Sequence, residues 1–155
     1  MRTARAPLPI TRMELTFQHD MPGFRGARHF AVEPLVEGTP AIFARLRCTD
    51  SIHLHGGETL NDLTLLVMSP GFLWHDYDVE IGELMIEELG LSDPNDMALL
   101  AIVHPQDPLS QSTANLYSPI VINRRTGVAD QFVPGTSEQE FGWPLRAPFP
   151  HDREE

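Results

Sequence analysis

The stretch from residue 97 to residue 133 limits the possible folds of this chain more than any other part. Residues 97–103, with the sequence MALLAIV, form a continuous apolar run of strand length, which is typical of a strand buried on both faces. Residues 114–123 end in a β-branched run that favours a pleated strand. Residues 128–133 follow a short polar link, whose Gly127 can take the positive φ that closes a hairpin. Three strands joined by short links predict an antiparallel sheet.

Shorter strand-like segments precede this sheet. The sequence MPGF at residues 21–24 predicts a type II turn, because Pro presets φ at the second position and Gly supplies the positive φ at the third. Pro34 should lie at a sheet edge or end its strand. Residues 47–62 are polar and contain adjacent glycines, which predicts a long turn or loop. We expect the additional strands at residues 13–17, 28–36, 41–46 and 63–68.

A single segment, residues 82–89, predicts a helix. Its apolar residues recur at helical spacing, and Gly90 suits the left-handed residue just past a helix end. Two turns of helix are not stable alone in water, so this helix must pack on the sheet. The sequence therefore predicts a mainly β fold, a small antiparallel β-barrel-like single domain with one short helix. We expect a loose arm at residues 1–12, the barrel domain at residues 13–145 and a disordered tail at residues 146–155.

The charge of the chain limits the partners that it can have. The 155 residues carry a net charge of -11 at pH 7, and all 11 basic residues are Arg. A nucleic-acid-binding surface needs clustered cations, so we expect no direct contact with nucleic acid. The single Cys48 excludes an intramolecular disulfide, and no apolar run reaches the roughly 18 residues that span a membrane. We therefore expect a cytoplasmic protein, with either a basic protein partner or an acidic surface that serves only solubility.

Carboxylates are densest at residues 76–96, which contain eight Asp and Glu residues and no Lys or Arg. Three aromatic residues lie at the start of this segment or just before it. Aromatic side chains amid carboxylates suit an interface with apolar anchors and a charged rim, although packing in the barrel explains them equally well. The candidate partner-binding residues are Phe72, Trp74, Asp76, Tyr77, Asp78, Glu80, Asn115 and Ile120.

The main alternative is a metal-dependent enzyme built around His53, His55 and Glu58. On a strand the two His side chains would point to the same side, and the carboxylate could supply a third ligand for Zn, Fe or Mn. The spacing is similar to that of a cupin-type barrel, but it is one residue short before Glu58. Histidines in a solvated turn are the other explanation. No Ser or Cys lies in a nucleophile motif and no glycine pattern suits a phosphate, so we expect no catalytic residue and no cofactor.

Several motifs occur together in an order that one family shares. They are MPGF at residues 21–24, DYDVEI at residues 76–81, LGLSDPND at residues 89–96 and STANLYSPIVIN at residues 112–123. Over residues 13–133 the chain resembles the flagellar assembly factor FliW family. The residues that carry the most specific part of this resemblance are Pro22, Gly23, Phe24, Asn115, Leu116, Pro119, Ile120, Val121, Ile122 and Asn123.

The resemblance implies a β-barrel-like protein without catalytic activity. Proteins of this family bind the translational regulator CsrA and also flagellin, so that free flagellin controls flagellin synthesis. The resemblance thus implies a CsrA-type regulator and flagellin as partners, with no direct contact with nucleic acid or membrane. The chain departs from the family pattern in Arg25, where an acidic residue is usual, in a longer segment at residues 48–62 and in the ending at residues 141–145. These departures concern the partner surface rather than the fold.

Overall fold

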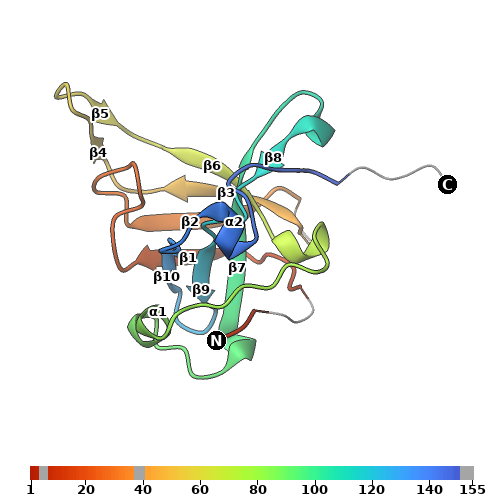
Figure 1. Cartoon of the computed structure of the whole chain (residues 1–155). Coiled ribbons are helices and arrows are strands. Elements are labelled where there is room, and N and C mark those ends of the chain that lie inside the picture. The colour runs from red at the N-terminus through yellow and green to blue at the C-terminus, as the bar shows by residue number, and fades with distance from the viewer. Residues whose placement is uncertain (4–6, 37–40, 151–155) are drawn as a thin grey trace.

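A closed barrel of seven strands forms the centre of the molecule (Figure 1). The computed structural model describes residues 1–3, 7–36 and 41–150. The barrel strands are β1 (Met13–Phe17), β2 (His29–Pro34), β3 (Phe43–Cys48), β6 (Thr64–Met68), β7 (Met97–His104), β9 (Ile120–Asn123) and β10 (Val128–Gln131). Around the barrel their order is β7, β6, β3, β2, β1, β10 and β9, and β9 pairs again with β7. The mainly β, barrel-like fold expected from the sequence is confirmed.

Strands β1 and β10 pair in parallel and so close the barrel, whereas all other neighbouring strands of the barrel pair antiparallel. The barrel is thus mainly antiparallel, as expected, with one parallel seam that the sequence did not predict. Thr16 donates a backbone hydrogen bond to the carbonyl of Gly127 at 2.9 Å. Gly127 has a φ of 81°, and a Cβ atom placed on it would lie 2.6 Å from the carbonyl oxygen of Glu14. Only glycine permits this approach of the two backbones.

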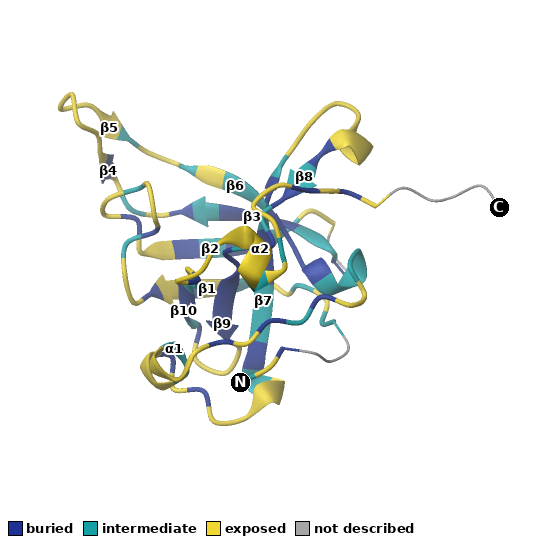
Figure 2. Cartoon of the chain, in the orientation of Figure 1, coloured by how far each residue is buried: buried dark blue, intermediate teal, exposed yellow. Residues whose placement is uncertain are grey.

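Alternating side chains divide the apolar residues between two cores (Figure 2). The barrel core fills the interior and contains Phe17 and Phe30, whose ring centroids are 4.7 Å apart. The outer core lies on the other side of β7, β9 and β6, beneath the segment that carries the first helix. Strand β7 contributes side chains to both cores, because Leu100 belongs to the barrel core and Ala101 to the outer core. Its predicted burial on both faces is confirmed.

Several short elements lie outside the barrel ring. They are β4 (Ile52–His53), β5 (Thr59–Leu60), β8 (Thr113–Ala114), β11 (Ala147–Pro148), α1 (Glu83–Glu88), α2 (Glu138–Phe141) and the 3-10 turns η1 (Pro70–Phe72), η2 (Pro94–Asp96) and η3 (Leu109–Gln111). Helix α1 matches the expected helix, whereas α2 corrects the prediction of only one. Helix α2 begins at Ser137, whose hydroxyl accepts from the Glu140 amide, and ends at Gly142 with a φ of 96°. None of the helices in the described ranges has the length and apolar character needed to cross a membrane.

Two expected segments differ in their strand content from the prediction. The polar segment at residues 47–62 forms the β4–β5 hairpin, so the prediction of a plain loop is corrected. The predicted strand at residues 114–123 is two strands, β8 and β9. Asn115 and Pro119 lie between them, because the Asn115 side chain accepts hydrogen bonds from the amides of Tyr117 and Ser118 and so forms a turn.

Both ends of the chain pack on the domain where they are described, contrary to the expected loose arm and disordered tail. Thr3 is buried and exchanges hydrogen bonds with Val79, through its amide at 3.1 Å and its hydroxyl at 2.8 Å. Ile10 pairs with Ala41. At the other end, β11 pairs with β8 and Phe149 is buried in the outer core. Residues 151–155 lie outside the described part of the chain.

Candidate protein-interaction surface

Residues 76–81 alternate between carboxylates and buried apolar side chains on the outside of the barrel. Tyr77, Val79 and Ile81 are buried in the outer core, and the carboxylates between them are exposed or half-buried. In an extended chain, successive side chains point to opposite sides, so residues two apart lie on the same side. Burial of the apolar residues therefore fixes these carboxylates at the surface.

Helix α1 continues this acidic surface and adds an exposed leucine. Leu84 is 72% exposed, while Glu83 and Glu87 are exposed on either side of it along the chain. Met85 and Ile86 pack against the outer core and hold the helix in place. We call the surface formed by Asp76, Asp78, Glu80, Glu83, Leu84, Glu87 and Glu88 the acidic edge.

The N-terminus neutralises part of the acidic edge, which the sequence pattern did not reveal. Arg2 donates to Asp78 at 2.8 Å and lies 3.5 Å from Glu80. The N-terminal ammonium group of Met1 also binds the Glu80 carboxylate, and this hydrogen bond is the largest cause of a lowered pKa for Glu80. The hydrogen bond with Asp78 raises the pKa of Arg2. Asp78 and Glu80 are therefore less available to an external cation than their exposure suggests.

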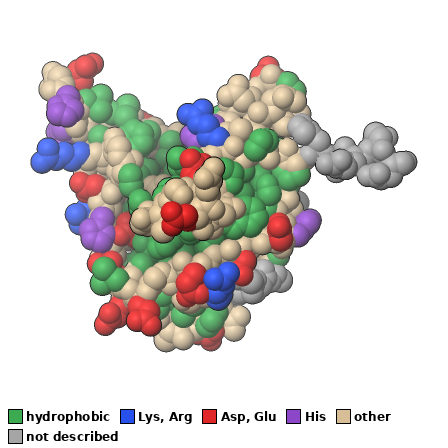
Figure 3. All heavy atoms as spheres, viewed as in Figure 1, with side chains coloured by type: hydrophobic (Ala, Val, Ile, Leu, Met, Phe, Trp, Pro, Cys, Tyr) green, Lys and Arg blue, Asp and Glu red, His purple; other side chains and the backbone are tan. Residues whose placement is uncertain are grey.

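Other carboxylates of the acidic edge are not neutralised by any basic side chain that the structure describes. Within residues 1–3, 7–36 and 41–150, no ion pair joins Asp76, Glu83 or Glu87 to a basic side chain. Figure 3 shows Asp and Glu side chains (red) gathered at the lower left, where Figure 1 places α1. The unneutralised charge of the acidic edge thus lies on Asp76 and α1 rather than on residues 78–80.

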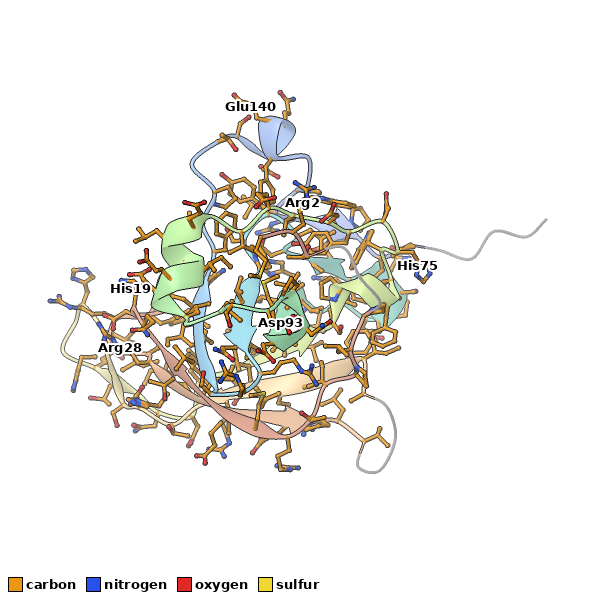
Figure 4. All side chains as sticks on the ribbon, turned by 90° about the horizontal axis from the view of Figure 1, so that it is seen from below. Arg2, His19, Arg28, His75, Asp93 and Glu140 are labelled. Carbon is orange, nitrogen blue, oxygen red and sulfur yellow. The ribbon has the colours of Figure 1, made fainter. Side chains whose placement is uncertain are left out.

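A histidine connects α1 to the barrel at the end of the acidic edge. His19 bonds through Nδ1 to Asp130, which is buried on β10, and its Nε2 lies 3.8 Å from the Glu88 carboxylate (Figure 4). The hydrogen bond with Asp130 is the largest cause of a raised pKa for His19. Gln18 also donates to the carbonyl of Glu88, at 3.0 Å. These contacts fix the C-terminal end of α1 against β1 and β10.

Two of the three predicted aromatic anchors, Tyr77 and Trp74, belong to the outer core. Tyr77 is buried, donates through its hydroxyl to the carbonyl of Leu116 at 2.8 Å, and meets the ring of Trp143 edge-on. Trp74 is half-buried against Phe149, with 6.0 Å between their ring centroids. Phe72 is half-buried in η1. Tyr77 is therefore a packing residue, and Leu84 is the exposed apolar group of the acidic edge.

Other residues of the sequence motifs lie in the cores or in turns. Ile120 is fully buried in the barrel core, so its proposed contact with a partner is corrected to a packing role. Asn115 forms the turn before β9, far along the chain from the carboxylates. Gly23 has a φ of 88°, and the amide of Phe24 donates to the carbonyl of Met21 at 2.9 Å, as a type II turn requires. The other residues of the 112–123 motif that lie in the cores are Ala114, Leu116, Val121 and Ile122.

The residues of the metal hypothesis lie on the β4–β5 hairpin. His53, His55 and Glu58 are all exposed. Among the described residues, no group of three or more His, Cys, Asp or Glu side chains is arranged to hold a metal ion. Nothing in the hairpin geometry therefore supports a three-ligand site.

Comparisons with known proteins agree with this architecture. The family model described as FliW protein matches residues 6–145. The flagellar assembly factor FliW of Bacillus licheniformis is 33% identical over 119 residues, which cover 77% of this chain and 76% of that protein. The Bacillus subtilis protein of the same name is 29% identical over the same length and coverage.

The fold also matches a solved structure. A crystal structure of the flagellar assembly factor FliW superposes with a TM-score of 0.73 and 22% sequence identity, covering 90% of this chain and 88% of that one. This likeness supports the fold, and the sequence matches support the family. The chain belongs to the FliW protein family.

Proposed function

We propose that this protein acts in flagellar assembly as a non-catalytic regulatory binding protein in the cytoplasm. Its proposed partners are a CsrA-type translational regulator and flagellin. Capture of the regulator would relieve repression of flagellin synthesis, and binding of flagellin would release the regulator again. The observation that supports this proposal best is membership of a family whose curated relatives are named flagellar assembly factors.

The acidic edge supplies a physical basis for attracting the regulator. Its free carboxylates, Glu83 and Glu87, flank a leucine that is 72% exposed. Carboxylates attract a basic protein over distances near the Debye length and speed its encounter. An exposed apolar side chain amid polar groups then offers surface to bury on contact. We propose that the regulator docks on α1, with charge setting the association rate and Leu84 the lifetime of the complex.

Binding kinetics of the purified protein with the host regulator test this proposal. Exchanging both Glu83 and Glu87 for Lys should slow association about tenfold at low salt and reduce its dependence on ionic strength. Leu84→Ala should mainly speed dissociation, because most effects of interface mutations appear in the dissociation rate.

A matched control uses two exposed carboxylates elsewhere. Glu58→Lys combined with Asp107→Lys makes the same change in net charge, and both residues are exposed outside the acidic edge. This variant should associate nearly as fast as the unaltered protein. An equal slowing in both variants would show that only overall charge matters and would refute the α1 site. Absence of binding to both the regulator and flagellin at about micromolar concentration would refute the proposed function.

A further inference from the structure

A second surface lies between the turn at residues 20–26 and the β4–β5 hairpin. The two segments enclose an open cleft with a volume of about 990 Å³, lined on the hairpin side by residues 52–55. Phe24 and Leu54 supply apolar surface, since Phe24 is half-buried and Leu54 is 42% exposed. The cleft is large enough for several residues of a peptide.

The cleft carries an exposed cation, Arg25, although the chain as a whole is strongly acidic. Arg25, His53 and His55 are exposed along it, and the nearby Asp20 is already bound by Arg28 at 2.9 Å. The hydrogen bond from Arg28 is the largest cause of a lowered pKa for Asp20, and Arg25 acts on it only more weakly, through space. Figure 3 shows His and Arg side chains at the upper left, where Figure 1 places the hairpin.

A second carboxylate near the cleft is also bound within the protein. Asp50 accepts from the amides of Arg28 and His29, each at 2.8 Å. Glu58 is exposed on the same hairpin but is not part of the cleft lining. Where a ligand would lie, the cleft therefore offers one exposed Arg and two imidazole rings, while its lining carboxylate, Asp20, is already paired.

The backbone of β4 offers an unpaired strand edge to the same cleft. Within the described part of the chain, strand β4 pairs only with β5, with His53 opposite Thr59. The amide of Leu54 donates to the carbonyl of Glu58 at 2.8 Å, which makes these two residues a hydrogen-bonded pair. Hydrogen-bonded and non-hydrogen-bonded pairs alternate along an antiparallel ladder, so the N–H and C=O of His53 point away from β5. Since the cleft is lined by β4 and not by β5, these groups face it.

We propose that this cleft binds an extended acidic peptide, which adds a strand along β4 and places its carboxylates against Arg25, His53 and His55. An unpaired edge recognises a peptide through main-chain hydrogen bonds, and alternate side chains supply the specificity. The size of the cleft, its apolar patches and the free backbone groups favour a peptide over a small anion. This site is separate from the acidic edge and does not depend on the proposed function.

Fluorescence anisotropy of the full chain with a labelled peptide of alternating Glu and Val tests the proposal. We expect the unaltered chain to bind the peptide at micromolar concentration and Arg25→Glu to bind it about tenfold more weakly. Arg45→Glu makes the same change of charge at an exposed residue of β3, and its binding should be unchanged. His53→Pro should abolish binding, because proline removes the N–H that faces the cleft, whereas His53→Ala should weaken it only a few-fold. Thermal unfolding of the proline variant shows whether the domain remains folded.

Several results would overturn the proposal. They are no binding of the peptide to the unaltered chain, equal binding of a peptide of alternating Lys and Val, equal loss in Arg25→Glu and Arg45→Glu, and full binding by folded His53→Pro. Competition by free glutamate at the same concentration as the peptide would identify a small-anion site instead. Self-association that Arg25→Glu abolishes, seen as a concentration-dependent molecular mass, would assign the cleft to a second copy of the chain.

Discussion

The side-chain amide of Asn123 donates a hydrogen bond to the main-chain carbonyl of Leu89, at 2.9 Å, and lies 3.4 Å from the carbonyl of Gly90. Asn123 is buried at the end of β9, while Leu89 ends α1. The last carbonyls of a helix have no partner within it. Asn123, the final residue of the 112–123 motif, therefore supplies a hydrogen-bond donor to the carbonyls at the C-terminal end of α1. This contact fixes α1 to the barrel.

Replacing Asn123 by Ala should lower the free energy of unfolding by about 2 kcal/mol, because it leaves buried backbone carbonyls without a donor. Urea unfolding measures this loss. Asn61→Ala is the control, since Asn61 is exposed and accepts a single hydrogen bond from Ser51. The control should change stability by no more than about 0.5 kcal/mol. Equal losses would show that the contact with Leu89 has no special importance.

Gly127→Ala should be among the most destabilising single substitutions, with a loss of about 3 kcal/mol or more. The added methyl group would lie 2.6 Å from the backbone oxygen of Glu14, so the parallel seam would have to shift. Gly142→Ala provides the comparison, because Gly142 also has positive φ but an added Cβ would meet nothing within 4 Å. It should cost about 1 kcal/mol, the usual strain of a left-handed alanine. A similar loss in both variants, by urea unfolding, would mean that the seam tolerates the methyl group.

The contact between His19 and Asp130 should make stability depend on pH. The pKa of His19 is raised above its ordinary value of 6.5, so the folded state binds its proton more tightly than the unfolded state. The stabilisation is thus fully present below pH 6.5 and is lost as the pH rises through the folded pKa. The stability difference between the unaltered chain and His19→Gln should therefore be larger at about pH 5.5 than at about pH 9. A difference that does not vary with pH would contradict this assignment.

Arg2→Ala should increase the rate at which a basic partner associates. Arg2 binds Asp78 and lies near Glu80, so its removal exposes negative charge next to α1 (Figure 4). Stability should change little, because exposed ion pairs contribute weakly. Stopped-flow association at low salt should show an increase of a few-fold that disappears at high salt. If the rate is unchanged, residues 78–80 lie outside the region that steers the partner.

Local patterns in the sequence identified most of the regular elements. The apolar run at residues 97–103 became β7, and the helical spacing before Gly90 became α1. The order of the Pro and Gly residues at positions 22 and 23 fixed the turn. Each of these depends on neighbours within a few residues, which is why the sequence alone was sufficient.

Contacts between distant segments were not predictable in this way. The parallel pairing of β1 with β10 joins residues more than a hundred positions apart, and hydrophobic periodicity does not specify which strands meet. Arg2 was not recognised as the partner of Asp78 for the same reason. Alternation around Tyr77 did carry information, because Tyr77, Val79 and Ile81 share one side, which predicts burial instead of an exposed aromatic anchor. The exposure of Leu84 could have been recognised from its position between carboxylates on a short helix.

The seam between β1 and β10 bears on when the molecule can form during its synthesis. The first barrel strand stays without its second neighbour until Val128 and Ala129 have been made and are free to pair. Long-range pairings of this kind slow folding, since the ends of a long loop must find each other. A growing chain that does not yet include β10 therefore presents an open sheet in place of a barrel.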